Sequence, residues 1–487
     1  MAKLFPWISL NLAKLFPWIS LFYLITHLMT TYYPRLIDPF LEEWKNNPGH
    51  KPLLLRGARQ VGKSSAVRHL ALKFENFVEI NFEKNPVYKD IFKKDLDPER
   101  IVREISLLSD KKIENKKTLL FLDEIQESPE AIMSLRFFKE DLPDLHVVAA
   151  GSLLEFALEN ISTYGVGRIH SMFMYPMTFD EFLLANSMTK LIEERNRANV
   201  SQPLPDYLHN KIVDLFRTYL LTGGLPEVVD NWIKYHDYIK CQQIQDDLII
   251  SYETDFAKYK KRIDPILLQN ILMSVTLQLS HKFGFSKVKG DYTSTKVKEG
   301  IDLLKKAGLV SLVYKTSANG LPLASESSVN EFKVMYFDPG LALRILNMSM
   351  GYNSRDIVEG ILLSSVTDLV NKGAMTEMVA GLEMMRYKSP NIRHDSFYWE
   401  RDVRNSSAEV DYIEAFNGKV LPIEVKAGVQ GGMKSLWMFM NQKKVSLGVR
   451  TSLENFGKIE REDEINKEVV ICPLYVLSQL NRVISNC

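Results

Sequence analysis

One segment of the chain reads Gly57-Ala58-Arg59-Gln60-Val61-Gly62-Lys63-Ser64. An apolar run from Leu53 to Leu55 precedes it as a buried strand would, and an amphipathic stretch from Ser64 to Phe74 follows it as a helix would. Glycines in such a loop let successive backbone N–H groups curve around phosphate oxygens, while the N-terminal end of the next helix faces the negative charge. The segment therefore predicts a phosphate-binding loop within an α/β domain.

Individual side chains of this loop have separate expected roles. Lys63 would neutralise the β- and γ-phosphates of a nucleotide, and Ser64 would bind Mg²⁺. No Asn-Lys-x-Asp motif, which would select guanine, occurs in the chain, so the expected nucleotide is ATP. The remaining residues expected to contact it are Gly57, Ala58, Arg59, Gln60, Val61, Gly62 and Ser65.

A second acidic motif fits this loop. The apolar run that begins at Thr118 ends in Asp123 and Glu124. Asp123 would hold Mg²⁺ through water, and Glu124 would be the general base that activates the attacking water. Two acids after a strand are ordinary in a solvated turn, but together with a phosphate-binding loop they indicate nucleotide hydrolysis.

Two further residues each have two interpretations. Ser152 follows an apolar run from Leu145 to Gly151 and either senses the γ-phosphate or caps a helix. Arg168 either contacts a phosphate, in its own subunit or in a neighbouring copy of a homo-oligomer, or is an ordinary surface arginine.

Composition sets the outer limits. With 487 residues and 46% hydrophobic content, the chain is long enough for several domains. Its net charge of +1 provides no global argument for nucleic-acid binding, and its three widely spaced cysteines fit reduced thiols in the cytoplasm. Apolar runs alternate with amphipathic segments and predict a parallel sheet covered on both faces, with strands at Leu53–Gly57, Phe77–Phe82, Thr118–Asp123, Leu145–Gly151 and Ile169–Tyr175.

The first residues are unusual because positions 2–10 recur without change at positions 13–21. Folded domains do not duplicate in this way, so residues 1–28 are interpreted as an upstream mis-start or a local sequence duplication, with Met29 as a plausible true start. A membrane anchor is the alternative, although the run is short for a bilayer span and Pro17 interrupts it.

The middle of the chain predicts two helical parts. Residues 201–262 read as a helical lid with a break between Thr222 and Glu227. Residues 263–330 read as a winged-helix module, with one helix from Pro265, a second from Thr293 to Ala307, and a following strand. The lysines on the second helix suit DNA reading and plain domain packing equally well.

The last part of the chain carries a second group of charged residues. Two alternating segments joined at Asn417-Gly418 predict a β-hairpin on which Asp411, Glu424 and Lys426 converge. Together with Glu377 from a preceding helix, these side chains could hold a second Mg²⁺ or Mn²⁺ against a phosphodiester of DNA or RNA. A solvated hairpin with alternating charges is the competing interpretation.

From about Tyr33 onward, the chain resembles a prokaryotic family of AAA-type P-loop ATPases that carry a C-terminal domain of uncharacterised function. Besides the loop, the motifs that carry this resemblance are Asp123-Glu124-Ile125-Gln126, Ala150-Gly151-Ser152, Gly167-Arg168, Pro176-Met177-Thr178-Phe179-Asp180-Glu181-Phe182 and Gly223-Gly224-Leu225-Pro226-Glu227. The C-terminal domain of that family is similar to the PD-(D/E)XK nuclease fold, and its four expected positions are Glu377, Asp411, Glu424 and Lys426.

The resemblance implies an α/β protein with a P-loop core, a helical lid, a winged-helix module and a restriction-endonuclease-like domain. The expected bounds are 1–32 for the duplicated segment, 33–200 for the core, 201–262 for the lid, 263–330 for the module and 331–487 for the last domain. The leading hypothesis is an Mg²⁺-dependent ATPase that gates a nuclease. The alternatives are an ATP-dependent switch with a non-catalytic docking domain and, third, a small-molecule kinase.

Overall fold

The computed structural model describes residues 32–151, 158, 167–260, 262–349, 372–402, 408–428, 432–462 and 466–485. The chain divides into two compact units, Met1–Pro34 and Arg35–Cys487, and every described helix and strand belongs to the second. Residues 1–28, interpreted above as a mis-start or an anchor, lie outside the described residues. Within the described part of the chain, no helix combines the length and hydropathy that crossing a bilayer requires.

The first sheet has five parallel strands in the order β2-β3-β4-β1-β5. Every residue of the interior strand β3 is buried, as expected for a continuous apolar run in a parallel sheet covered on both faces. The strands of this sheet are β1 (Leu53–Arg56), β2 (Asn76–Asn81), β3 (Thr118–Asp123), β4 (His146–Ala150) and β5 (His170–Phe173). The five predicted strands are confirmed, with ends that differ by at most two residues.

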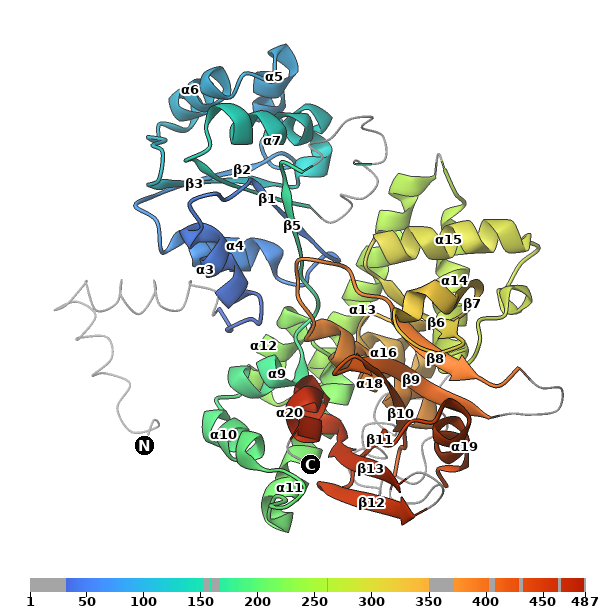
Figure 1. Ribbon diagram of the computed structural model, residues 1–487. Coiled ribbons are helices and arrows are strands. Elements are labelled where there is room, and N and C mark those ends of the chain that lie inside the picture. Colours follow the sequence, from blue (N-terminus) through green and yellow to red (C-terminus); the bar gives the residue numbers. More distant parts are fainter. Residues whose placement is uncertain are drawn as a thin grey trace, which may run out of the picture. The chain divides into compact units, whose positions relative to one another are not determined.

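Helices cover both faces of this sheet (Figure 1). On one face lie α3 (Asp38–Asn46) and α4 (Lys63–Ala71), and on the other lie α5 (Val87–Lys94), α6 (Pro98–Ser109) and α7 (Pro129–Asp141). The second group buries its apolar side chains against the strands, among them Phe92, Ile101, Ile105 and Leu135. This architecture confirms the predicted α/β class with a parallel sheet.

A helical region follows the first sheet. The predicted break between Thr222 and Glu227 is present, because one helix ends at Thr222 and the next starts at Pro226. The helices are α9 (Phe179–Ala185), α10 (Thr189–Arg197), α11 (Asp206–Thr222), α12 (Pro226–Tyr235), α13 (Tyr238–Asp255), α14 (Pro265–Leu277), α15 (Ser294–Lys306) and α16 (Pro339–Ser349).

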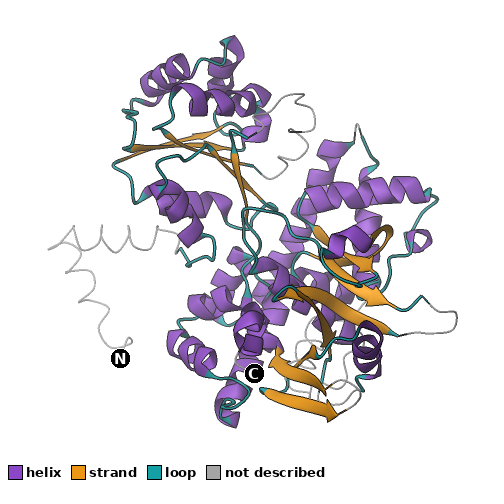
Figure 2. Ribbon diagram, in the orientation of Figure 1, coloured by secondary structure: helices purple, strands orange, loops and turns teal. Residues whose placement is uncertain are grey.

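The second sheet is mixed and has eight strands in the order β12-β13-β11-β10-β9-β8-β6-β7 (Figure 2). Its strands are β6 (Val310–Thr316), β7 (Ser327–Tyr336), β8 (Ser396–Glu400), β9 (Glu409–Phe416), β10 (Lys419–Val425), β11 (Leu447–Ser452), β12 (Gly457–Glu462) and β13 (Asn466–Pro473). The helices beside it are α18 (Lys372–Arg386), α19 (Lys434–Lys443) and α20 (Leu480–Ser485). Short 3-10 turns occur at Ile125–Glu127, Phe256–Tyr259, Phe285–Lys287, Leu323–Glu326 and Leu474–Gln479.

The strand β6 connects two predicted domains. It pairs antiparallel with β7 and parallel with β8, so the hairpin assigned to the winged-helix module continues the sheet of the last domain. The predicted boundary after residue 330 therefore falls inside β7. The winged-helix assignment itself stays a prediction, as do the other domain bounds.

The lysines of α15 are partly engaged within the chain. Lys298 donates to Asn330 at 2.9 Å, and Lys305 donates to the Tyr314 hydroxyl at 3.0 Å. These contacts tie the helix to the β6–β7 hairpin. They favour the domain-packing interpretation of this helix over DNA reading.

Candidate functional site

The predicted phosphate-binding loop connects the carboxyl end of β1 to α4. Gly57 has φ of +144°, and a Cβ there would lie 2.1 Å from the carbonyl oxygen of Met174. Gly62 has φ of +99°, in the left-handed region that other residues rarely adopt. Only glycine suits either position, so the sequence of the loop follows from its backbone geometry.

Lys63 lies inside this loop. Its Nζ donates to the carbonyl oxygens of Gly57 at 2.9 Å and Ala58 at 2.7 Å. Burial lowers the pKa of Lys63 to about 8, although the charges of Glu124 and Asp123 act in the opposite direction. Within the described part of the chain, only neutral carbonyls accept hydrogen bonds from this buried cation, which is therefore poised for an anionic partner such as a phosphate.

Oxygen-bearing side chains gather beside the loop, at the carboxyl ends of β2 and β3. The Ser64 hydroxyl donates to Asp123 Oδ2 at 3.1 Å, and Asn81 Nδ2 donates to the same oxygen at 3.2 Å. Hydroxyl and carboxylate oxygens are the ligands that Mg²⁺ prefers. Ser64 and Asp123 therefore fit the expected metal, and the structure brings them together as predicted.

Glu124 follows Asp123 in a left-handed backbone conformation, with φ of 51°. Its Oε2 accepts a hydrogen bond from Gln126 Nε2 at 2.6 Å, which fixes the direction of the carboxylate. Sequence reasoning quoted Gln126 only as part of a motif and assigned no role to Asn81. Both are polar residues at or just after a strand end, which is the signal that could have identified them.

The helical region contacts the loop through α13. Arg59 Nη1 lies 2.9 Å from both carboxylate oxygens of Asp255, and the Tyr252 hydroxyl donates to the Arg59 carbonyl at 2.8 Å. The helical region thus contacts the loop through Arg59, one of the residues expected to contact the nucleotide, and its role as a lid stays a prediction.

Arg35 joins three separate segments beneath the loop. Its Nη1 donates to the Val61 carbonyl at 2.7 Å, its Nη2 to the Tyr175 carbonyl at 2.7 Å, and its Nε pairs with Glu181 at 2.9 Å. Both charged side chains are at most 5% exposed. Glu181 also accepts from the backbone of Thr178 within the capping box of α9. We call this group the Arg35 junction.

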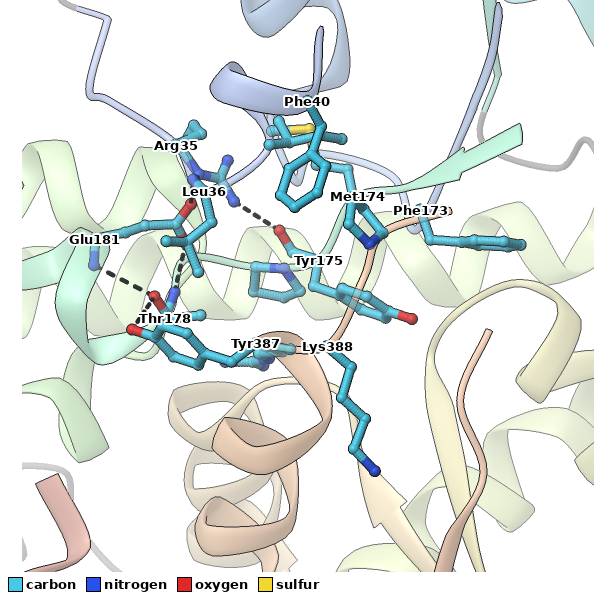
Figure 3. A pocket seen from close by; sticks show the side chains of 14 residues that line it. Arg35, Leu36, Phe40, Phe173, Met174, Tyr175, Thr178, Glu181, Tyr387 and Lys388 are labelled. Carbon is cyan, nitrogen blue, oxygen red and sulfur yellow. Dashed lines mark hydrogen bonds and ion pairs between the residues drawn. The ribbon is translucent and has the colours of Figure 1, made fainter. Parts of the chain in front are cut away.

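A cavity of about 110 Å³ adjoins the Arg35 junction (Figure 3). Figure 3 shows Arg35 and Glu181 on one side of it, Phe40 above, and Tyr387 and Lys388 below. The cavity is partly open to the surface, and Arg35 and Glu181 contribute to its lining.

A buried polar cluster links the start of α9 to α18. Arg386 donates to the Phe337 carbonyl at 2.6 Å and to the Tyr219 hydroxyl at 2.8 Å, and the Phe179 backbone N–H donates to Glu383 at 3.3 Å. Burial raises the pKa of Glu383 to about 7 despite the neighbouring Arg386. Because Phe179 and Glu181 belong to the same turn of α9, this cluster and the Arg35 junction are directly connected.

Ser152 and Arg168 are the two other residues predicted near the loop. Ser152 lies outside the described residues. Arg168 precedes β5, at the amino end of the parallel sheet, where it forms an ion pair with Glu140. The loop follows the carboxyl ends of the strands, so Arg168 does not reach the loop of its own subunit. A role in a neighbouring copy stays a prediction.

The four residues predicted in the last domain occupy one region of the second sheet. Asp411 accepts from the Val425 backbone N–H at 2.7 Å, and Lys426 donates to Glu424 Oε1 at 2.6 Å. Tyr412, next to Asp411, donates to the carbonyl of Glu377 at 2.8 Å. Burial, with the charge of Asp411 second, raises the pKa of Glu424 to about 7. The hairpin turn at Asn417-Gly418 has positive φ at both positions, as predicted for its type.

Two residues of this region were missed. Glu377, Glu409 and Asp411 present oxygens within 4.8 Å of one another, and Lys333 of β7 pairs with both Glu377, at 2.7 Å, and Glu409. Glu409 shares a face of β9 with Asp411 by simple alternation and could have been identified from the sequence. Lys333 could not, because only the pairing of β6 with β8 brings its strand near β9.

Family models match three parts of the chain. Residues 49–183 match the AAA domain, and the geometry of the loop, Lys63 and Asp123 agrees with that match. The first sheet and its helices form an AAA-type P-loop domain. Residues 213–351 match a domain of unknown function (DUF8612), and residues 372–475 match another domain of unknown function (DUF4143). Neither of these two matches tests the nuclease-like assignment.

The solved structures to which this chain is similar are distant from it in sequence. The Aeropyrum pernix ORC1 protein in complex with DNA is 13% identical, with a TM-score of 0.29 over 65% of this chain and 93% of that chain. A STAND protein with a tetratricopeptide repeat sensor from Pyrococcus horikoshii is 11% identical (TM-score 0.25; 72% and 49% covered). A Thermotoga maritima RuvB protein is 16% identical (TM-score 0.27; 56% and 86% covered).

This chain therefore spans about half the length of the Pyrococcus protein that it matches. Sequence identities and TM-scores this low support no conclusion about what the present chain binds. Among curated proteins, none matches it.

The affinity of the AAA domain for ATP should depend on the charge of Lys63. Since burial lowers the pKa of Lys63 to about 8, the free protein loses this charge as the pH rises past that value. Bound phosphate favours the charged form, so the dissociation constant for ATP should increase above about pH 8, approaching tenfold per pH unit. Calorimetric titration between about pH 7 and pH 10 measures this slope. In Lys63→Arg the positive charge persists over this pH range, so its dissociation constant for ATP should not rise in this way. An equally steep rise in Lys63→Arg and in the unchanged protein would contradict the prediction.

Removing the guanidinium of the Arg35 junction should destabilise the fold strongly. Arg35→Met leaves Glu181 buried without its cation, and breaking a buried pair in this way costs about 3–5 kcal/mol. Chemical denaturation measures the loss, and Arg35→Met combined with Glu181→Gln should recover part of it. As the matched control, Lys93→Met removes an exposed ion pair with Asp90 and should leave the denaturation midpoint unchanged. Equal effects of the two single changes would be inconsistent with this account.

Proposed function

We propose that this chain binds ATP together with Mg²⁺ and hydrolyses it to ADP and phosphate. The observation that carries the proposal is the arrangement of Lys63, Ser64 and Asp123 around the loop of an AAA domain. Lys63 supplies positive charge, while the glycine-rich backbone supplies N–H donors for the phosphate oxygens. When bound, Mg²⁺ neutralises phosphate charge, and Ser64 and Asp123 are the residues that would hold it.

In the hydrolytic step, Glu124 acts as the general base. Its carboxylate accepts a proton from a water molecule as the water oxygen forms a bond to the γ-phosphorus. The bond between the γ-phosphorus and its bridging oxygen breaks, and that oxygen leaves with ADP. Gln126 holds the carboxylate in place through the hydrogen bond at 2.6 Å. The reaction releases inorganic phosphate to water, which separates an ATPase from a kinase acting on a small-molecule acceptor.

Binding and hydrolysis should separate in two variants. Glu124→Gln should keep ATP binding but lower the turnover number by about 10²–10⁴-fold, the usual contribution of a general base. Lys63→Ala should lose binding itself. Nucleotide titration and phosphate release measure the two effects. Glu127→Gln, which changes an exposed carboxylate paired with Lys89, is the matched control and should behave as the unchanged protein. Full turnover in Glu124→Gln would refute the assigned base.

We further propose that the Arg35 junction carries the nucleotide state to the last domain. Arg35 contacts the loop at Val61 and, through Glu181, the start of α9. The same turn of α9 contacts Glu383 of α18, and Arg386 extends the contact to Tyr219 of the helical region. A shift of the loop around bound phosphates therefore has a continuous polar route to α18, and the cavity adjoins this route.

Phosphodiester cleavage by the last domain is the second candidate. The gathering of Asp411, Glu424 and Lys426 near Glu377 favours it. However, Lys333 already pairs with two of the carboxylates that a metal ion would need. The cluster as found does not fit a second Mg²⁺ or Mn²⁺, so we derive no cleavage step from it. We propose instead an ATP-dependent switch in the cytoplasm whose last domain docks a partner without cutting it.

A cleavage panel separates these two candidates. The full chain is incubated with single- and double-stranded DNA and RNA, with Mg²⁺ or Mn²⁺, with and without ATP. We expect release of phosphate from ATP but no cut strands, because Lys333 occupies the acid cluster. Cutting that disappears in Asp411→Asn and persists in Glu414→Gln, a change on the same strand outside the cluster, would establish the nuclease and contradict the switch.

A further inference from the structure

Lys333 occupies a central place in the acid cluster of the second sheet. Its Nζ lies 2.7 Å from Glu377 Oε1 and also pairs with Glu409 Oε1. The side chain is 2% exposed, and its ammonium lies 5.0 Å from the ring centre of Tyr398. A lysine buried this deeply persists only when its charge is matched, and here the carboxylates match it.

The cluster has the chemistry of a cation site. Oxygens of Glu377, Glu409 and Asp411 lie within 4.8 Å of one another, and two of these carboxylates are bound to the same ammonium. The other oxygens are constrained as well: Asp411 Oδ2 accepts from the Val425 backbone. Nearby, Glu424 is buried, and its Oε2 accepts no hydrogen bond from the described residues. The region therefore contains more carboxylate oxygens than the described hydrogen-bond donors and cations around them can satisfy.

The elements that meet here come from two separately matched parts of the chain. Lys333 lies in β7, within residues 213–351, whereas Glu377, Glu409 and Asp411 lie within residues 372–475. The cation and the carboxylates thus lie in two separately matched segments of the chain. The ion pairs of Lys333 fasten β7 to α18 and β9, so this lysine has a structural role in addition to balancing the carboxylates.

We propose that Lys333 is the built-in cation of this acid cluster: its ammonium takes the position of a divalent ion, and the cluster accepts Mn²⁺ or Mg²⁺ only when the ammonium is removed. Occupancy of the cluster by the Lys333 ammonium does not depend on whether the last domain cuts nucleic acid or on whether the AAA domain hydrolyses ATP.

The physical reason is competition for the same oxygens. A divalent ion needs several carboxylate or carbonyl oxygens at about 2.0–2.6 Å, and a neighbouring ammonium repels it. At about 4 Å and the effective dielectric of protein sites, two like charges interact by several kcal/mol. Removing the ammonium takes the only described cation partner from Glu377 and Glu409 and leaves three crowded carboxylates, an arrangement that favours the entry of another cation.

Mn²⁺ binding to the full chain without nucleotide tests the proposal. The protein, Lys333→Met and Lys333→Met combined with Glu377→Gln are compared by equilibrium dialysis, with Mn²⁺ as the probe. We expect Lys333→Met to bind one more Mn²⁺ than the unchanged protein. The affinity of the cluster for Mn²⁺ should be at least about tenfold higher in Lys333→Met than in the unchanged chain. The double variant should lose that ion. Added Mn²⁺ should also raise the melting temperature of Lys333→Met specifically.

Two outcomes would overturn the proposal. One is a Mn²⁺ ion already bound by the unchanged protein and lost in Glu377→Gln, because the ammonium and the metal would then coexist. The other is a folded Lys333→Met that binds no additional Mn²⁺. If Lys333→Met does not fold, Lys333→Gln, which removes the charge but keeps a polar donor, takes its place under the same criteria. Lys282→Met is the matched control, since it removes the exposed ion pair of Lys282 with Glu331 and should gain no ion.

Discussion

The buried guanidinium of Arg35 is the contact on which the arrangement of the site depends. It lies just before α3, yet it binds the carbonyl of Val61 in the loop, the carbonyl of Tyr175 after β5, and the carboxylate of Glu181 in α9. A planar group with several fixed donors suits such a junction, and a lysine could not make the same set of bonds. Because both charges are removed from water, neither can be lost without leaving the other unpaired.

The two charged sites of the chain differ in what holds their lysine. In the AAA domain, the described partners of Lys63 are loop carbonyls, and burial brings its pKa down to about 8, so an incoming phosphate meets a cation that no described carboxylate contacts directly. In the second sheet, burial works against the charge of Lys333, but Glu377 and Glu409 outweigh it and hold that pKa above its usual value. The first lysine is available to a ligand, whereas the second is already satisfied.

Sequence reasoning succeeded where the determining contacts are local. The five strands of the first sheet, the loop and the turn at Asn417-Gly418 follow from runs of apolar residues, glycine positions and short spacing. Ser64 and Asp123 were each predicted to hold Mg²⁺; they form a hydrogen bond at 3.1 Å, and their role at a metal stays a prediction. Contacts set by tertiary packing were not accessible: Arg35 and Glu181 are 146 residues apart, and Lys333 reaches Glu377 where α18 packs against β7. The fold was therefore more predictable than the electrostatics of its sites.

Hydrogen exchange tests most directly whether the nucleotide state reaches the last domain through the Arg35 junction. Amide protection along α9 and α18 is compared with and without ATP in Glu124→Gln, which holds ATP without turnover, and in the same protein carrying Arg35→Lys. The account predicts that ATP changes protection in the loop, in α9 and in α18, and that Arg35→Lys confines the change to the loop and α4. A change at α18 that survives Arg35→Lys, or no change beyond α4 in either protein, would contradict it.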